Sequence, residues 1–265
     1  MSLTLSAPKA CIVRSVSPSF ESCLREAKVD IDAEAARSQH ARYIELIGEF
    51  VPTIIMLESS EDHPDCCYVE DVAVCINRFA LITRPGAPTR RGECEAMVPE
   101  LAEFFELVIM EAPATLDGGD VMRVGNRFFV GRSARTNDEG INILRDVAER
   151  DGAEVIAVDV PQGLHLKSAC TMLDENTVVI DPAVLSAEVF SKHGLLCIEA
   201  CESLGANVLA FGSELIASEA APKTIERLRD AGYSVHTLCV DELHKGDGAL
   251  SCLSIRIPRE DHWAV

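Results

Sequence analysis

The chain has 265 residues, of which 48% are hydrophobic, and a formal net charge of −19. This length and apolar fraction allow a substantial buried core in one large or two small domains. The 24 lysines and arginines are scattered and form no basic stripe, so we expect no nucleic-acid partner. An acidic surface favours solubility and would also draw a small cationic substrate towards a carboxylate-lined cleft.

The sequence indicates neither a membrane segment nor a metal site. No apolar run approaches the roughly 18 to 20 residues that a membrane span needs, and residues 1–10 do not resemble a signal peptide. We therefore expect a cytoplasmic protein without membrane contact. The 11 cysteines are odd in number and lie in apolar segments, which indicates reduced thiols. Cys197 and Cys201 could share a helical face, but no histidine stands beside them at ligand spacing, so we predict no metal or cofactor.

The first part of the chain predicts a strand, a helix and a second strand. Residues 11–13 are a short apolar run. From Asp32, a good N-cap, apolar residues recur every three or four positions until Pro52, which indicates one buried helix face. His40 lies on that face and is expected to pack in the core. Residues 53–57 predict a buried strand.

A pattern of two strands, a helix and another strand recurs along the rest of the chain. Apolar hairpins are predicted at residues 72–82, 121–130 and 170–180, starting 49 positions apart, and a weaker one ends in residues 206–211. Helices are predicted at residues 92–105, 137–150, 182–193 and 222–231, and further strands at 107–110, 154–158 and 234–239. A repeat of this period predicts an array of similar units.

Five such units need about 250 residues, which is close to the whole chain. Residues 11–57 and a C-terminal strand would then supply the unit that closes a ring. A closed ring buries each unit against its neighbours and brings loops from distant parts of the sequence around one axis. No linker rich in Pro, Gly or Ser divides the chain, so we expect residues 1–265 to form a single α/β domain.

Polar residues stand in the loops that such a ring would bring to its axis. Glu70 and Asp71 interrupt an otherwise apolar run. Buried carboxylates need a partner, which a cationic ligand would supply, whereas carboxylates at an exposed strand start would need none. The loop at residues 83–92 holds Arg90 in a rigid frame, where it could bind a carboxylate or lie in solvent before a helix.

The second hairpin is flanked by two further polar loops. Asp117 and Asp120 enclose two glycines, which indicates that another group approaches the backbone closely there. Arg135 follows the hairpin, and Asn137 is placed to cap the next helix.

The third and last loops contain a histidine and a cysteine. His165 alternates with Leu164 and Leu166, which places the imidazole on the opposite face, towards water or the axis. Residues 246–257 predict a late strand with Cys252 near its mouth, either as a packing residue or as a nucleophile. Cys252, His165 and Asp117 together supply the nucleophile, proton carrier and orienting carboxylate that a covalent mechanism needs.

These motifs, in this order along nearly the whole chain, resemble the dimethylarginine dimethylaminohydrolase family of the pentein superfamily. The matching stretches are residues 69–71, 82–91, 116–120, 134–137, 164–167 and 251–252. The resemblance implies a five-bladed ββαβ propeller with pseudo-fivefold symmetry. It also implies hydrolysis of Nω,Nω-dimethyl-L-arginine, or of monomethylarginine, to L-citrulline and dimethylamine or methylamine, without a metal or cofactor.

The resemblance implies a role for each matching residue. Cys252 is the nucleophile, His165 the general acid and base, and Asp117 the carboxylate near His165. The substrate would be held by Asp65, Glu70 and Asp71 at its cation and amine, by Arg90 and Arg135 at its carboxylate, by a carbonyl near Gly246, and by Phe20 on an N-terminal lid loop. Phe20 stands where the family often has leucine, which is a departure from its pattern.

Other functions remain open from the sequence. Arginine deiminases share the Cys, His and carboxylate chemistry, but are typically longer and carry an acidic residue where this chain has Lys167. Hydrolysis of citrulline is a close alternative. A different class is a non-catalytic protein that binds an amino acid, or a soft metal such as zinc through Cys252 and His165. In the enzyme, we expect the thiol to be protonated without substrate and to ionise when substrate binds. A homodimer is plausible, although no interface patch stands out.

Overall fold

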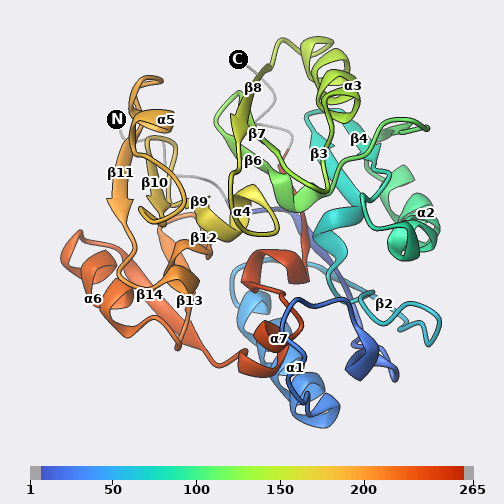
Figure 1. Ribbon diagram of the computed structural model, residues 1–265, viewed down its shortest axis with the longest axis horizontal. Coiled ribbons are helices and arrows are strands. Elements are labelled where there is room, and N and C mark those ends of the chain that lie inside the picture. Colours follow the sequence, from blue (N-terminus) through green and yellow to red (C-terminus); the bar gives the residue numbers. More distant parts are fainter. Residues whose placement is uncertain (1–6, 260–265) are drawn as a thin grey trace.

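The computed structural model describes residues 7–259, which form five three-stranded sheets placed around one centre (Figure 1). In spatial order the strands of the sheets are β15-β1-β2, β3-β4-β5, β6-β7-β8, β9-β10-β11 and β12-β13-β14. In each sheet the middle strand pairs antiparallel with one neighbour and parallel with the other. The predicted five-unit ββαβ propeller is therefore confirmed.

The elements have the following bounds. The strands are β1 (Ala10–Arg14), β2 (Ile54–Leu57), β3 (Ala73–Ile76), β4 (Phe79–Ile82), β5 (Glu106–Ile109), β6 (Val121–Val124), β7 (Arg127–Arg132), β8 (Glu154–Asp159), β9 (Cys170–Met172), β10 (Thr177–Ile180), β11 (Leu196–Glu199), β12 (Val208–Phe211), β13 (Glu214–Ser218), β14 (Ser234–Leu238) and β15 (Ile255–Ile257). The α-helices are α1 (Ala33–Gly48), α2 (Val98–Ala102), α3 (Asp138–Glu149), α4 (Leu166–Ala169), α5 (Glu188–Ser191), α6 (Pro222–Asp230) and α7 (Asp241–Lys245).

The two ends of the described chain close the ring. Strand β1 pairs antiparallel with β15, where Ala10 lies opposite Ile257, and parallel with β2, where Cys11 lies opposite Ile54. The sheet β15-β1-β2 thus combines residues from both ends of the sequence, as predicted. Because every sheet has a neighbour on each side, all five can bury both of their faces.

Five hydrophobic clusters fill the spaces between neighbouring sheets. Successive side chains of a strand point to opposite faces, so one strand contributes to two clusters. On β7, Phe128 packs with Leu81 of β4, whereas Phe129 packs with Val178 of β10. The same division repeats around the ring, so that each sheet is fixed between its two neighbours.

Capping residues predicted from the sequence begin two of the helices. The carboxylate of Asp32 accepts the N–H groups of Glu34 and Ala35 at the start of α1, at 3.0 and 2.9 Å. Asn137 Oδ1 accepts the N–H of Gly140 at 2.8 Å and also that of Thr115 at 3.0 Å. Asn137 therefore joins α3 to the preceding loop as well as capping it.

Two predicted helices are much shorter than expected. Residues 92–105 are largely a 3₁₀ helix, Pro88–Met97, and α2 begins afresh beside Pro99, which lacks the N–H that a continuous α-helix requires at that position. Residues 182–193 contain only the four-residue α5. The side chain of Asp181 accepts the N–H of Ala183, a local turn that competes with a longer helix.

Four other predictions also need correction. The stretch 246–257 is not one strand, because a 3₁₀ turn, Leu250–Leu253, holds Cys252 before the short strand β15. His165 lies at the N-terminus of α4 and not within an alternating strand. Strand β2 is only half-buried. Cys197 lies on β11 and Cys201 beyond its end, so the two share no helix face.

Within the described residues 7–259, no helix has the length and apolar character needed to cross a membrane.

The two hydrogen bonds accepted by Asn137 Oδ1 predict how much this residue contributes to stability. Asn137→Ala removes an acceptor from Thr115 and from the first turn of α3, and should lower the free energy of unfolding by about 1 to 2 kcal/mol in urea titrations. Asn137→Asp keeps an acceptor, so its free energy of unfolding should remain close to that of the unchanged protein. Equal stability of Asn137→Ala and the unchanged protein would show that the cap contributes nothing.

Candidate active site

A small cavity lies where loops that adjoin all five sheets meet. Its volume is about 30 Å³, which is room for little more than a water molecule. The lining residues are Leu24, Asp65, Tyr68, Asp71, Arg90, Arg135, Leu164, His165, Gly246, Asp247, Gly248 and Cys252. The fold thus brings residues that are up to 228 positions apart (24 to 252) to one place.

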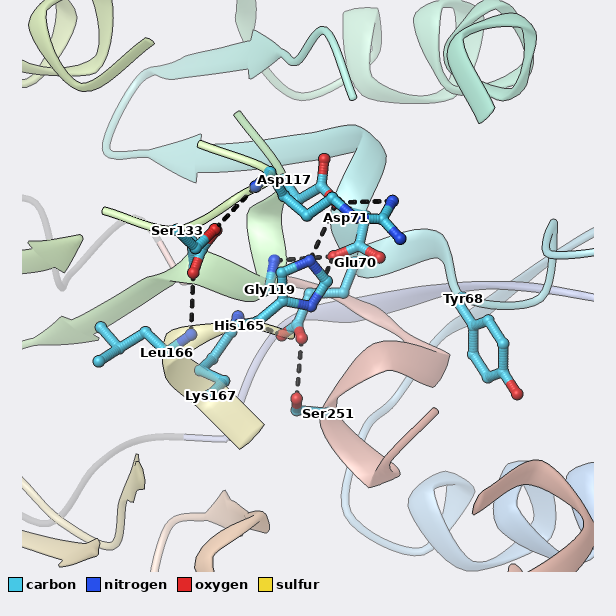
Figure 2. A network of polar contacts seen from close by, with 12 residues as sticks. Tyr68, Glu70, Asp71, Asp117, Gly119, Ser133, His165, Leu166, Lys167 and Ser251 are labelled. Atoms are coloured by element: carbon cyan, nitrogen blue, oxygen red, sulfur yellow. Dashed lines mark hydrogen bonds and ion pairs between the residues drawn. The ribbon is translucent and has the colours of Figure 1, made fainter. Parts of the chain in front are cut away.

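The imidazole of His165 is buried between carboxylates. Its Nε2 lies 2.9 Å from Oδ2 of Asp117, and its Nδ1 lies 3.9 Å from Oδ1 of Asp71 (Figure 2). Gly119 makes this approach feasible, because a Cβ there would lie 2.5 Å from His165 Nδ1 and 2.7 Å from Asp71 Oδ1. The close approach predicted for the two glycines after Asp117 is therefore confirmed, and the approaching groups are this ring and carboxylate.

The surrounding charges decide the protonation state of His165. Burial alone would lower the pKa of the imidazole, but the charge of Asp71, the hydrogen bond to Asp117 and the nearby Asp120 together raise it to about 9. At neutral pH the ring therefore carries a proton and a positive charge. A charged imidazole in a cavity is a proton donor for a leaving group.

The thiol of Cys252 is kept neutral by the same surroundings. Cys252 is half-buried on the 3₁₀ turn, and its N–H donates to the carbonyl of Ala249 at 3.1 Å. Burial and the negative charges of Glu70 and Asp71 raise the pKa of the thiol to about 12. A thiol in this state needs an added positive charge nearby before it becomes a nucleophilic thiolate.

Arg90 lines the cavity, yet its donors are bonded within the chain. Its Nη1 pairs with Asp71, its Nη2 lies 2.7 Å from Glu93 Oε2, and Nη2 also donates to the carbonyl of Tyr68 at 2.8 Å. The side chain is 5% exposed, so it does not lie in solvent. Arg90 and His165 together hold the pKa of Asp71 below its usual range, against the effect of burial. Arg90 therefore positions Asp71 and also contributes to the cavity lining.

Glu70 lies behind the cavity and is not part of its lining. It is buried, which rules out the alternative of an exposed strand start. Its Oε1 lies 2.5 Å from Lys167 Nζ and 3.1 Å from Arg256 Nη2, and Oε2 accepts the hydroxyl of Ser251 at 2.8 Å (Figure 2). The cationic partners of Glu70 therefore belong to the protein itself, and through Ser251 this carboxylate fixes the residue that precedes Cys252.

Arg135 is the more accessible cation of the cavity, whereas Asp65 is buried. The Arg135 side chain is 20% exposed, and its Nη1 lies 3.8 Å from Asp117, beyond hydrogen-bond length. Burial raises the pKa of Asp65 to about 6, although Arg90 opposes this shift. An incoming cation would favour the charged form of Asp65.

Phe20 is not part of the cavity lining, whereas Leu24 is. Phe20 is fully buried, and its ring centroid lies 6.0 Å from that of Tyr68. Leu24 comes from the following loop, and its N–H donates to Oδ1 of Asp65 at 3.0 Å. Asp247 accepts the N–H of Glu26 at 2.6 Å, so carboxylates from opposite sides hold this loop over the cavity.

Tyr68 is another lining residue of the cavity that the sequence did not indicate. Its hydroxyl donates to the carbonyl of Leu243 at 2.8 Å, and its ring leaves no room for a Cβ at Gly248, which would lie 2.0 Å from Cε1. This contact explains why the loop from Gly246 to Gly248 contains two glycines. The only signal in the sequence was an aromatic residue beside the carboxylates, which propensity alone does not distinguish from packing.

A cation could be held by three side chains of this site. Donor atoms of Asp71, Asp117 and His165 lie within 4.8 Å of one another. These atoms already have partners within the protein. His165 bonds Asp117, and Asp71 bonds both Arg90 and the N–H of Gly119. A metal would have to replace these bonds and remove the proton from the imidazole.

This ring of five ββαβ units with a cysteine, a histidine and carboxylates at its centre defines a pentein of the guanidino-group-modifying type. The arginine deiminase family model matches residues 96–194. The N(G),N(G)-dimethylarginine dimethylaminohydrolase of Streptomyces coelicolor is 35% identical over 254 residues, covering 94% of this chain and 97% of that protein. The one from Pseudomonas aeruginosa is 34% identical over 227 residues, covering 85% of this chain and 89% of that protein.

Solved structures agree with these sequence relationships. A cysteine-to-serine mutant of the dimethylarginine dimethylaminohydrolase of Pseudomonas aeruginosa, complexed with citrulline, superposes with a TM-score of 0.88 at 32% identity. The superposition covers 95% of this chain and all of that one. The chain belongs to the dimethylarginine dimethylaminohydrolase family.

The burial of Cys252 predicts how it reacts without ligand. Alkylation by iodoacetamide, followed by peptide mass spectrometry at Cys252, should accelerate continuously with pH up to and beyond about pH 9, because the thiolate fraction keeps growing. Exposed Cys201 provides an internal comparison within the same protein. A rate at Cys252 that levels off below neutral pH would show that the thiol is already ionised.

Proposed function

We propose that this protein hydrolyses Nω,Nω-dimethyl-L-arginine, and monomethylarginine, to L-citrulline and dimethylamine or methylamine. The observation that carries this function is the pairing of a neutral thiol, Cys252, with a protonated imidazole, His165, in one carboxylate-lined cavity. The relatives named dimethylarginine dimethylaminohydrolase, and the solved structure of one of them with citrulline, support the same substrate and product.

The charged groups of the cavity suit the two ends of such a substrate. Asp65 and Asp71 are carboxylates that can hold the N–H groups of a guanidinium and fix its plane. Arg135 retains donors for the substrate carboxylate, and the carbonyl near Gly246 can accept from its amine. Arg90 acts indirectly by holding Asp71, and Glu70 acts indirectly through Ser251.

The first half of the reaction forms a covalent intermediate. The substrate cation favours loss of the Cys252 proton to solvent, and the resulting thiolate adds to the central carbon of the guanidinium. His165 gives its proton to the departing dimethylamine as the carbon–nitrogen bond breaks. Asp117 holds the imidazole in place during this transfer. An S-alkylthiouronium then remains on Cys252.

The second half releases the product. His165, now neutral, takes a proton from a water molecule, whose oxygen adds to the thiouronium carbon. The carbon–sulfur bond then breaks and its electron pair returns to the sulfur of Cys252. The proton of the added hydroxyl passes to that sulfur, which leaves the urea group of citrulline and restores the neutral thiol. His165 is protonated again, as it was at the start. One water is consumed for each amine and citrulline formed.

Substrate entry requires the loop that carries Leu24 to move. The cavity of about 30 Å³ is smaller than an arginine side chain, and Leu24 forms part of its lining. The bonds from Leu24 to Asp65 and from Glu26 to Asp247 would open during entry. Leu24, and not the buried Phe20, is therefore the residue that we propose to cover the substrate.

The position two residues after His165 favours a methylated substrate over arginine. Lys167 points away from the cavity and pairs with Glu70, so no carboxylate enters the cavity from this position. One edge of the guanidinium then lacks an ionic partner, which leaves room for alkyl groups. Arginine deiminase and citrulline hydrolase activities are the alternatives that a substrate comparison tests.

We further propose that residues 1–265 form one catalytic domain that works in the cytoplasm. The ring uses strands from both ends of the described chain, which supports a single unit. All 11 cysteines are free thiols, which fits a reducing compartment. Exposed Ile109 and Leu196 on the strands β5 and β11 are apolar groups that a homodimer could cover.

The substrate preference can be measured directly. Initial rates of citrulline formation from dimethylarginine and from arginine, and of ornithine formation from citrulline, should give the highest kcat/KM for dimethylarginine. A higher value for either unmethylated compound would contradict the proposal. Cys252→Ala should lower kcat by about 10³-fold or more, because no covalent intermediate can form.

The role of Arg135 predicts a separate effect on substrate binding. Arg135→Gln should raise KM by about tenfold, the typical loss for one charge-assisted hydrogen bond, with a smaller effect on kcat. Arg132→Gln is the matched control, because Arg132 bonds Asp138 and Asp159 on the surface. An unchanged KM in Arg135→Gln would place the substrate carboxylate elsewhere.

A further inference from the structure

A second and larger cavity lies behind the active site. Its volume is about 500 Å³, and its lining includes Glu70, Lys167 and Ser251. Their sequence neighbours Asp71 and Cys252, and the nearby His165, line the active-site cavity instead. The same three segments therefore separate the two cavities, and Figure 2 shows the bonded group of Glu70, Lys167 and Ser251 close to His165.

The charged side chains of this rear cavity are more positive than negative. The charged lining residues are the cations Arg123, Lys167 and Arg256 and the carboxylates Glu70 and Glu175. Lys167 and Arg256 both bind Glu70. An excess of positive charge stands out in a chain whose net charge is −19. A site of this kind attracts anions.

Arg123 is a half-buried cation that has no carboxylate partner among residues 7–259. Its Nε donates to the carbonyl of Gly125 at 2.8 Å, and its Nη2 donates to Asn77 Oδ1 at 2.7 Å. Both acceptors are neutral. Burial lowers the pKa of the guanidinium. The cation–π contact with Phe128, 5.2 Å from Cζ to the ring centroid, offsets this desolvation weakly, and full compensation needs an anionic partner. An anion in the cavity would supply that compensation.

Arg256 has a donor that remains unused. Its Nη2 binds Glu70, whereas Nη1 is buried and has no hydrogen-bond partner among the described residues. Both Arg256 and Arg123 act on the thiol of Cys75, whose pKa each of them lowers against the effect of burial. Arg123 and Arg256 both line the rear cavity, which therefore offers two guanidinium groups to an anion.

The remaining wall of the rear cavity is mainly apolar. Val74, Met122, Phe128, Val208, Leu209 and Ile255 contribute to it. Binding sites for small organic molecules combine such a surface with a few convergent polar groups, and typically enclose about 300 to 1,000 Å³. Planar carboxylates match the fork of a guanidinium particularly well.

We infer that the rear cavity binds a small organic carboxylate, with its charged group between Arg123 and Arg256 and its apolar body against this wall. The site is distinct from the one that holds the substrate, and the inference does not depend on the proposed reaction. Its ligand class follows from the unused Nη1 of Arg256, from Arg123, whose hydrogen-bond acceptors are neutral, and from the apolar lining.

Calorimetric titration with 4-phenylbutyrate tests this inference. The carboxylate should bind the full chain, whereas 4-phenylbutyramide, which has the same shape without the charge, should bind at least about tenfold more weakly. Arg123→Gln and Arg256→Gln should each weaken binding of 4-phenylbutyrate by a similar factor. No binding to the unchanged protein, or equal binding of the acid and the amide, would overturn the inference.

Two control variants separate the rear cavity from other cationic sites. Arg135→Gln removes the accessible cation of the active-site cavity, and Arg132→Gln removes a surface cation. Both should bind 4-phenylbutyrate as the unchanged protein does. Loss of binding in Arg135→Gln, together with intact binding in Arg123→Gln, would place the anion in the active-site cavity and contradict the inference. Circular dichroism and cooperative thermal unfolding confirm that each variant is folded.

Discussion

The ion pair of His165 with Asp117 and Asp71 is the interaction on which the site depends. This interaction keeps the imidazole charged at neutral pH although the ring is buried. It also stabilises the charged forms of two buried carboxylates, which burial alone would destabilise. Gly119 is required because any side chain there would displace the ring. Arg90 is required because it balances the second carboxylate. The same negative charge that protonates His165 keeps the thiol of Cys252 neutral.

The closed ring is what brings these groups together. Asp71, Asp117 and His165 stand at the starts of three successive sheets, and Cys252 precedes β15 in the sheet that joins both ends of the described chain. Apolar clusters between all neighbouring sheets fix the distances at the centre. A loss of packing between two sheets would therefore alter the site without removing any of its residues. The rear cavity is a consequence of the same geometry. A ring of five sheets leaves space along its axis on both sides of the hydrogen-bonded residues at its centre.

Much of the fold could be predicted from the sequence, because a repeat of hairpin, helix and strand is a local pattern that returns at a fixed spacing. The helix that begins at Asp32 and the closing of the ring by the C-terminal strand followed from this pattern. The short helices near Pro99 and Asp181 did not, because local turns compete with helical periodicity there. The partners of the charged side chains could not be predicted either, since they come from distant segments.

The candidate site shows the same limit. Motif order singled out Cys252, His165 and Asp117, and the structure brings all three to the centre of the ring. Motif order could not reveal that Arg90 binds internal carboxylates, that Glu70 faces the rear cavity, or that Leu24 lines the active-site cavity. The most direct test is the titration of His165 by NMR of ¹³C-labelled histidine, assigned with His165→Gln. We expect a pKa near 9 in the protein without ligand, whereas a value at or below the ordinary 6.5 would contradict a charged His165 at neutral pH.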